Sequence, residues 1–192
     1  FLQFDDLIDL AIPRGGESLI RRVCSEAQMP VLKHFSGNCH VYVDKTADLD
    51  MAEKILINAK CQRMGVCNAA ESLLVHRNIA EEYLPRVADQ LQAHGVEIVG
   101  DDETRRILPG VGRATEEDFA MEFLGPKLSV AIVRSIDEAI DHINHFGSRH
   151  TDAIVTSEDA TAERFAARVD TAVVLVNAST RFNDGGELGI GA

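Results

Sequence analysis

The sequence predicts an α/β fold in which helices flank a largely parallel sheet. Apolar segments of strand length alternate with segments of helical periodicity along nearly the whole chain. Two patterns typical of helix starts, Asn78 with Glu81 and Ser135 with Glu138, each follow an apolar run. This alternation is typical of βαβ units, because a helix commonly connects two parallel strands.

In the first half of the chain, apolar segments that predict strands alternate with amphipathic segments that predict helices. The segment 17–27 gathers its apolar residues on one helical face, and Gly95 is expected to end the helix before it. The expected strands are 7–12, 39–43 and 72–76, and the expected helices are 17–27, 47–60 and 79–94.

The second half continues the pattern and contains no candidate for a membrane helix. Its longest apolar run, 172–176, has the length of a strand, well short of the ~20 residues that span a bilayer. The opening residues lack the basic start and cleavage site of a signal peptide, so we expect a cytoplasmic protein. The expected strands are 96–100, 127–133, 152–156 and 172–177, and the expected helices are 136–146 and 159–169.

The charge balance disfavours nucleic acid as a partner. The chain has 31 Asp and Glu against 19 Lys and Arg, which gives a formal net charge of −12. Binding to a phosphate backbone needs a basic stripe, whereas scattered acidic residues are typical of a solvated surface. A small anionic substrate remains compatible with this composition, since one local cluster of Arg or Lys suffices to bind it.

Cys67, in the stretch CQRMGVCNAAESLLVH, is the residue with the most open role. The chain has four cysteines, too few for a disulfide scaffold, and we expect them to be reduced thiols. The chain lacks a C-x-x-C spacing, so the cysteines do not predict a metal site. Residues 68–71 are compatible with a helix, whose first N–H groups would favour a Cys67 thiolate, while the backbone N–H of Cys67 itself could stabilise an oxyanion. The residues alone leave Cys67 open as a nucleophile or as a buried packing residue.

Two stretches are candidates for ligand binding, and a third, by itself, marks only a turn. Gly15 and Gly16 lie between a predicted strand and a predicted helix, where free N–H groups bind phosphate, although a plain tight turn explains them equally well. The stretch EFLGPKL places a Gly-Pro turn before a strand. The polar stretch NASTRFNDGGELG, 177–189, follows a buried strand, and loops at the carboxyl edge of a parallel sheet commonly bind ligands.

Five stretches, which together cover nearly the whole chain, resemble the γ-glutamyl phosphate reductases, also called glutamate-5-semialdehyde dehydrogenases. This family belongs to the aldehyde dehydrogenase superfamily, so an aldehyde dehydrogenase-like fold is implied. KHFSGNCHVYVD and NASTRF are characteristic of the reductases rather than of the superfamily. The stretches, in order, are IPRGGESLIRRV, KHFSGNCHVYVD, QRMGVCNAAESLLVH, EFLGPKLSVAIV and NASTRFNDGG.

The resemblance implies an enzyme that reduces L-glutamyl 5-phosphate to L-glutamate 5-semialdehyde with NADPH in proline biosynthesis. Cys67 matches the catalytic cysteine of the family and would form a thioester as phosphate leaves. Glu122 matches the superfamily glutamate that holds the nicotinamide ribose, and Gly15 and Gly16 match the turn near the pyrophosphate. Lys33 stands where hydrolytic members carry a glutamate base, which fits a reductase that protects its thioester from water, although it could equally be a plain loop cation.

The resemblance also implies substrate contacts. Ser179 and Thr180 belong to the loop that holds the acyl chain in the family. Arg181 is expected to bind the α-carboxylate of the substrate, because a guanidinium group fits a carboxylate, with a structural loop arginine as the alternative. Arg63, four residues before Cys67, is expected to favour the thiolate or to meet the phosphate.

The resemblance divides the chain into residues 1–30, the end of an NADP-binding domain, 31–178, the catalytic domain, and 179–192, a substrate loop leading back to the cofactor domain. We therefore expect a fragment of a longer enzyme that forms homo-oligomers and associates with glutamate 5-kinase. Two alternatives stay open: another semialdehyde dehydrogenase of the superfamily, and a non-catalytic domain of a bifunctional pyrroline-5-carboxylate synthase.

Overall fold

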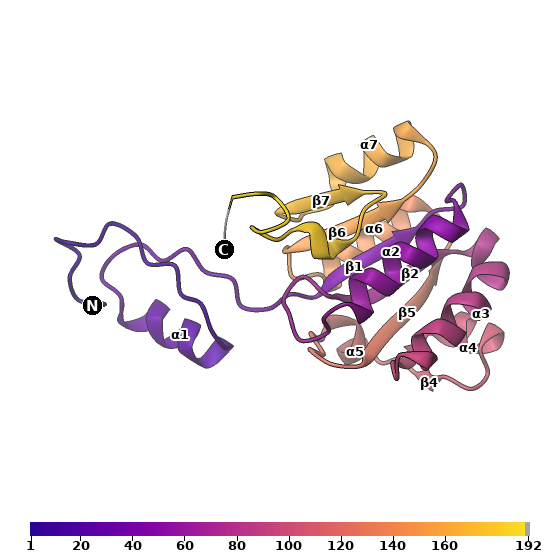
Figure 1. Ribbon diagram of the computed structural model, residues 1–192, viewed down its shortest axis with the longest axis horizontal. Coiled ribbons are helices and arrows are strands. Elements are labelled where there is room, and N and C mark those ends of the chain that lie inside the picture. Colours follow the sequence, from indigo (N-terminus) through magenta and orange to yellow (C-terminus); the bar gives the residue numbers. More distant parts are fainter. Residues whose placement is uncertain (191–192) are drawn as a thin grey trace. The chain divides into compact units, whose positions relative to one another are not determined.

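The computed structural model describes residues 1–190, which form two compact units. The first unit comprises residues 1–36, and the second begins at Gly37 and contains all the strands of the sheet (Figure 1). Residues 191 and 192, the end of the expected substrate loop, lie outside the described residues.

The first unit contains the helix α1 (Glu17–Glu26), close to the expected 17–27. The strand expected over 7–12 is wrong, because these residues form turns and only Ala11 pairs with another segment, through a single parallel bridge to Val31. A strand requires a continuous row of hydrogen bonds to a neighbour. An apolar run alone does not supply that neighbour.

The second unit is built on a parallel sheet, as the sequence predicts. Among the described residues the strands lie in the order β4-β3-β5-β2-β1-β6-β7, and every neighbouring pair is parallel. The strands are β1 (Cys39–Val43), β2 (Ala70–His76), β3 (Glu97–Gly100), β4 (Gly112–Arg113), β5 (Lys127–Val133), β6 (Thr151–Val155) and β7 (Val173–Val176).

Helices cover both faces of this sheet (Figure 1). Val41 and Val43 of β1 pack in the cluster formed with α2 and α3, whereas Tyr42 packs on the opposite face with α6 and α7. This alternation follows from the two-residue period of a strand. The principal helices are α2 (Leu49–Cys61), α3 (Arg77–Ala93), α6 (Ile136–Phe146) and α7 (Asp159–Arg168).

One of the two expected helix starts is confirmed and the other is wrong. Ser135 accepts a hydrogen bond from the N–H of Glu138 at 3.2 Å, so it caps α6 as predicted. The helix α3 begins at Arg77, and its cap is His76, whose Nδ1 accepts the N–H of Asn78 at 3.2 Å. The Asn78–Glu81 box therefore does not start this helix. The reason is that β2 passes into α3 without an intervening loop.

Residues 101–126 contain three short elements that the sequence pattern does not predict. They are α4 (Asp102–Ile107), β4 (Gly112–Arg113) and α5 (Glu116–Ala120). Asp101 caps α4 by accepting the N–H of Thr104 at 2.7 Å, and Thr115 caps α5. Such short elements hold too few apolar residues to display a period.

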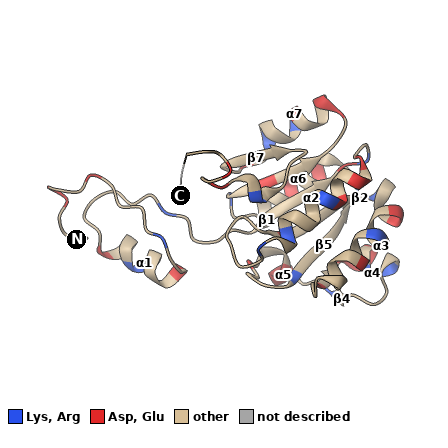
Figure 2. Cartoon of the chain, in the orientation of Figure 1, with Lys and Arg blue, Asp and Glu red and all other residues tan. Residues whose placement is uncertain are grey.

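Charged residues occur mainly on the helices and loops (Figure 2). Lys and Arg are interspersed there with Asp and Glu rather than gathered in one continuous basic stripe. No helix within residues 1–190 is long and apolar enough to cross a membrane.

Because His142 is half-buried, we expect the protein to lose stability as the pH falls. Its ring packs against Phe119 with centroids 5.1 Å apart, and its Nε2 is buried without a partner among the described residues. Burial lowers the pKa of His142 to about 3. An unfolded chain binds this proton near pH ~6.5, so the free energy of unfolding should fall as the pH drops from ~6.5 towards 3.

Between pH ~6.5 and 5 the free energy of unfolding should fall less in His142→Phe than in the original chain, by up to about 2 kcal/mol. Urea unfolding at both pH values measures this difference. His94→Gln, at an exposed position, is the matched control and should leave the loss unchanged. The same loss in His142→Phe as in the original chain would show that His142 does not cause it.

Candidate active site

Cys67 lies in the turn between α2 and β2, at the amino edge of the sheet. It is exposed, whereas the strand that follows it is buried throughout. The expected helix over 68–71 is wrong, since Ala70 already begins β2. Residues 68–71 therefore provide no helix N-terminus beside the Cys67 thiol.

Several loops meet at this edge because the strands are parallel and their amino ends share one side. Residues 37–38 lead into β1, residues 62–69 into β2, and residues 121–126 into β5. Register fixes their relative heights, since Cys39 pairs with Ala70, and Ser72 pairs with Ser129. Cys67 therefore lies at the edge opposite to the carboxyl edge, where the loop 177–189 is expected to bind a ligand.

Gly37 allows the backbone to pass close to Cys67. A Cβ on Gly37 would collide with the carbonyl group of Cys67, so no other residue fits there without a shift of the loop. Cys39 lies behind the same carbonyl, and its Sγ donates to the Cys67 oxygen at 3.3 Å. Burial raises the pKa of the Cys39 thiol well above its usual value. Cys39 is therefore a packing residue, and Cys67 is the accessible thiol of this pair.

Asn38 fixes the approach to β1. Its side chain is buried, and its Nδ2 donates to the carbonyls of Phe119 at 2.8 Å and Phe146 at 2.9 Å. The ends of α5 and α6 are thereby tied to the residue next to Gly37.

The segment after β7 returns to the amino edge. At its start Asn177 exchanges two hydrogen bonds with Thr156, at the carboxyl end of β6, each at 3.0 Å. At its end the Nδ2 of Asn183 donates to the Oγ1 of Thr151, the first residue of β6, at 2.7 Å. Residues 177–183 therefore pass along the length of β6, and the loop expected at the carboxyl edge reaches the opposite one.

Arg181 contacts the loop of Cys67 on both sides. Its Nε donates to the Oε1 of Gln62 at 2.9 Å, and its guanidinium group also donates to the side-chain oxygen of Asn68. The Nδ2 of Asn68 in turn donates to the carbonyl of Asn183 at 2.9 Å. Residues 62–68 and 181–183 thus form one hydrogen-bonded unit.

The other predicted substrate residues differ in their availability. Ser179 is buried, and its Oγ accepts the N–H of Arg181 at 3.2 Å, which caps the 3-10 helix η1 (Thr180–Phe182). Thr180 is fully buried, and its hydroxyl has no partner among the described residues. Arg63 is exposed, and within residues 1–190 no carboxylate pairs with it.

Glu122 precedes a strained turn that rests on a buried ion pair. Leu124 has a φ of 51°, which is unusual for a residue other than glycine. Its N–H donates to the Oε1 of Glu71 at 3.0 Å, while the Oε2 of Glu71 accepts from Lys60 at 2.5 Å. Burial raises the pKa of the Glu71 carboxyl to about 7, against the opposing effect of the Lys60 ammonium group. Glu122 itself is half-buried.

Gly15, Gly16 and Lys33 belong to the first unit. Gly16 is the N-cap of α1, and no atom lies within 4 Å of the position where its Cβ would stand. Gly15 has a φ of 151°, which favours glycine. The open backbone at the start of α1 is compatible with a phosphate group. The ammonium group of Lys33 lies 5.5 Å from the ring centroid of Phe35.

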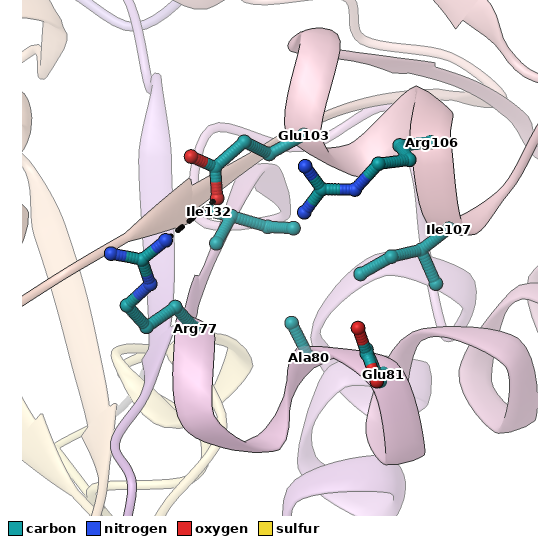
Figure 3. Close-up of a pocket in the computed structure, with 7 residues that line it drawn as sticks. All are labelled: Arg77, Ala80, Glu81, Glu103, Arg106, Ile107 and Ile132. Atoms are coloured by element: carbon teal, nitrogen blue, oxygen red, sulfur yellow. Dashed lines mark ion pairs between the residues drawn. The ribbon is translucent and has the colours of Figure 1, made fainter.

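A separate small cavity lies at the opposite edge of the sheet (Figure 3). It has a volume of about 130 Å³ and is lined by Arg77, Glu103 and Arg106 among others. Arg77 follows the last residue of β2, whereas Cys67 precedes the first, so the length of that strand separates the two places. The Arg77 guanidinium pairs with Glu103 at 3.8 Å. This cavity is not part of the Cys67 site.

Three residues that shape the loops are not identified by the sequence pattern: Lys60, Asn68 and Glu71. Their polar character on both sides of Cys67 could have indicated a structural role. Most of the residues that they contact, however, lie far away in the sequence. Gly37 and Asn38 belong to the stretch KHFSGNCHVYVD, but the sequence alone does not indicate their structural roles.

Comparison with known proteins gives consistent matches. Residues 8–110 and 107–190 match the aldehyde dehydrogenase family. The γ-glutamyl phosphate reductase of Rhodopirellula baltica is 60% identical over 192 residues, which are 100% of this chain and 44% of that protein. The enzyme of the same name from Salinibacter ruber is 54% identical over 191 residues, again 100% of this chain and 44% of that protein.

Solved structures agree with the observed architecture. The crystal structure of γ-glutamyl phosphate reductase from Thermotoga maritima has a TM-score of 0.96 at 46% identity, over 100% of this chain and 46% of that one. An acetylating aldehyde dehydrogenase from Geobacillus thermoglucosidasius has a TM-score of 0.73 at 20% identity, over 94% of this chain and 48% of that one, which supports the fold alone.

The chain spans less than half the length of these relatives. The aldehyde dehydrogenase-like fold expected from the sequence is confirmed by these structural matches and by the parallel sheet with helices on both faces. The two matched ranges together cover residues 8–190. The chain therefore belongs to the aldehyde dehydrogenase family.

Proposed function

We propose that this chain forms the catalytic part of a γ-glutamyl phosphate reductase, which reduces L-glutamyl 5-phosphate to L-glutamate 5-semialdehyde with NADPH in proline biosynthesis. The observation that carries the proposal is the exposed Cys67 on a loop fixed at the amino edge of the sheet. The relatives that are 60% and 54% identical bear the name of this reductase.

In the proposed reaction the Cys67 thiolate attacks the acyl carbon of the substrate. Phosphate leaves with the electron pair of the bond that it held, and a thioester to Cys67 forms. No acceptor among the described residues takes the backbone N–H of Cys67, which leaves it available to stabilise the oxyanion. Arg63, exposed four residues earlier, is the proposed contact of the departing phosphate.

The nicotinamide supplies the hydride that reduces the thioester. The hemithioacetal on Cys67 then collapses, so that the aldehyde leaves and the thiolate is restored. Glu122 would hold the nicotinamide ribose, and Gly15 and Gly16 would face the pyrophosphate. The half-buried carboxylate and the open N-terminus of α1 fit these roles.

The remaining residues would select the substrate and protect the thioester. Arg181 keeps part of its guanidinium group free of acceptors within residues 1–190, and this part would bind the α-carboxylate. Ser179 and Thr180 shape the loop behind it. Lys33, in place of a carboxylate base, would spare the thioester from hydrolysis.

Domain limits and partners follow from the same proposal. Residues 1–30 would complete an NADP-binding domain, 31–178 would form the catalytic domain, and 179–192 would lead back towards the cofactor. The full-length enzyme would be a cytoplasmic homo-oligomer that associates with glutamate 5-kinase.

Cys67 should react with iodoacetamide before the other cysteines at pH ~7, because it is exposed. Cys39 should react last, since it is buried and burial raises its pKa. Burial also raises the pKa of Cys61 and slows its reaction. Peptide mapping by mass spectrometry at timed intervals measures the order. Equal labelling of all thiols, or an inert Cys67, would contradict an accessible nucleophile.

In the full-length enzyme, NADP⁺ should be reduced with glutamate 5-semialdehyde only when phosphate is present. Cys67→Ser should lower this rate by at least about a thousandfold, because the thioester cannot form, while Cys61→Ser should retain it. Absorbance of NADPH provides the measurement. Reduction without phosphate would indicate a hydrolytic semialdehyde dehydrogenase, and no reduction in the parent enzyme would indicate a non-catalytic domain.

Arg181→Lys should raise the KM for the acyl phosphate by about tenfold or more with a smaller effect on kcat, because Lys keeps the charge but lacks the fork. Gln62→Ala, which removes one of the contacts of Arg181 with the loop, is the control and should leave the KM nearly unchanged. Arg181 would instead have only a structural role in the Cys67 loop if the KM stayed constant while kcat fell and the alkylation rate of Cys67 changed.

A further inference from the structure

Lys60 and Glu71 form a charged pair inside the protein. Both side chains have no exposed surface, and Lys60 Nζ lies 2.5 Å from Glu71 Oε2. Lys60 stands in the last turn of α2 and Glu71 is the second residue of β2, so the pair spans the loop that contains Cys67. Apolar residues of similar volume are often as stabilising as a buried ion pair, so stability alone gives no reason for this one.

Both members of the pair also contact the turn that follows Glu122. The free oxygen of Glu71 accepts the N–H of Leu124 at 3.0 Å. The ammonium group of Lys60 lies 6.0 Å from the ring centroid of Phe123, within range of a cation–π interaction. Two consecutive residues after Glu122 are therefore held by the two ends of one ion pair.

The backbone of this turn needs such support. The positive φ of Leu124 is unfavourable for a residue with a side chain and persists only where the surroundings impose it. A hydrogen bond to the Glu71 carboxyl is of the strong, charge-assisted kind when that group is ionised, the form that the Lys60 ammonium group favours. It engages the N–H of the strained residue itself.

The same turn lies against the loop of Cys67. A Cβ on Gly65 would stand 3.7 Å from the carbonyl oxygen of Leu124, which is ordinary van der Waals distance. The loop of Cys67 and the turn of Glu122 are therefore adjacent. Lys60 and Glu71 stand at the two ends of the Cys67 loop, and both contact the turn that follows Glu122.

We propose that Lys60 and Glu71 are positioning residues that set the turn of Glu122 relative to Cys67 and so prepare the binding of the nicotinamide ribose. This inference rests on the proposed function, which assigns the ribose contact to Glu122. Because both side chains are buried, we expect neither to touch the substrate or the cofactor. They act through Phe123 and Leu124.

Glu71→Gln in the full-length enzyme tests the proposal. An amide has one acceptor oxygen and one donor group, so it cannot accept from both Lys60 and Leu124 through two oxygens as the carboxylate does. We expect the Kd for NADPH, measured by quenching of its fluorescence, to rise by at least about tenfold. Hydrogen exchange at the Leu124 amide should also become faster.

Lys60→Met combined with Glu71→Met keeps the test valid if the single variant does not fold, because it leaves no unpaired buried charge. The Kd should rise in this variant as well. Ile143→Ala, in α6 on the other face of the sheet, is the control for a general loss of stability. It should lower Tm and leave the Kd for NADPH unchanged.

A double-mutant cycle separates positioning from a merely structural role. If Glu71 acts through Glu122, then Glu71→Gln should add less than about twofold to the Kd of a Glu122→Gln variant. Full additivity, or an unchanged Kd in Glu71→Gln while Glu122→Gln weakens binding, would overturn the inference and leave the proposed function standing. An unchanged Kd in Glu122→Gln would instead contradict the proposed ribose contact, and the inference with it.

Discussion

The candidate site depends on the close approach of the Gly37 backbone to the carbonyl of Cys67. That approach brings the entry of β1 and the entry of β2 together at the amino edge, and the parallel register then places the turn before β5 beside them. Cys39 supports the same carbonyl from the interior. The thiol is thus presented on a loop whose backbone is constrained, although the residue itself is exposed.

Polar contacts between loops then complete this edge. Asn68 and Arg181 connect the Cys67 loop to the segment after β7, and Glu71 connects the start of β2 to the turn of Glu122. Each of these bonds joins a buried or half-buried group to a partner in another loop. Because an unpaired buried polar group is costly, these contacts favour one arrangement of the loops over others.

Much of the fold was predictable from the sequence. The apolar runs from 39–43 to 152–156 form strands that are buried almost throughout, because helices cover both faces of the sheet, whereas the edge strand β7 is only partly buried. The errors fall where local pattern lacks a tertiary partner, as in 7–12, or where a strand passes directly into a helix, as at His76. The elements of 101–126 were too short to produce a period.

The sequence by itself determined the alternation of strands and helices and, by resemblance, the candidate nucleophile. Only the tertiary structure decided which polar residues meet around Cys67: Asn68 bonds to Asn183, 115 positions away, and Glu71 to Leu124, 53 positions away. It also showed that the loop expected at the carboxyl edge of the sheet runs back along β6 to the amino edge, where Cys67 lies. The physical reason is that periodicity records which face of an element is buried, whereas strand order and register decide which distant loops become neighbours.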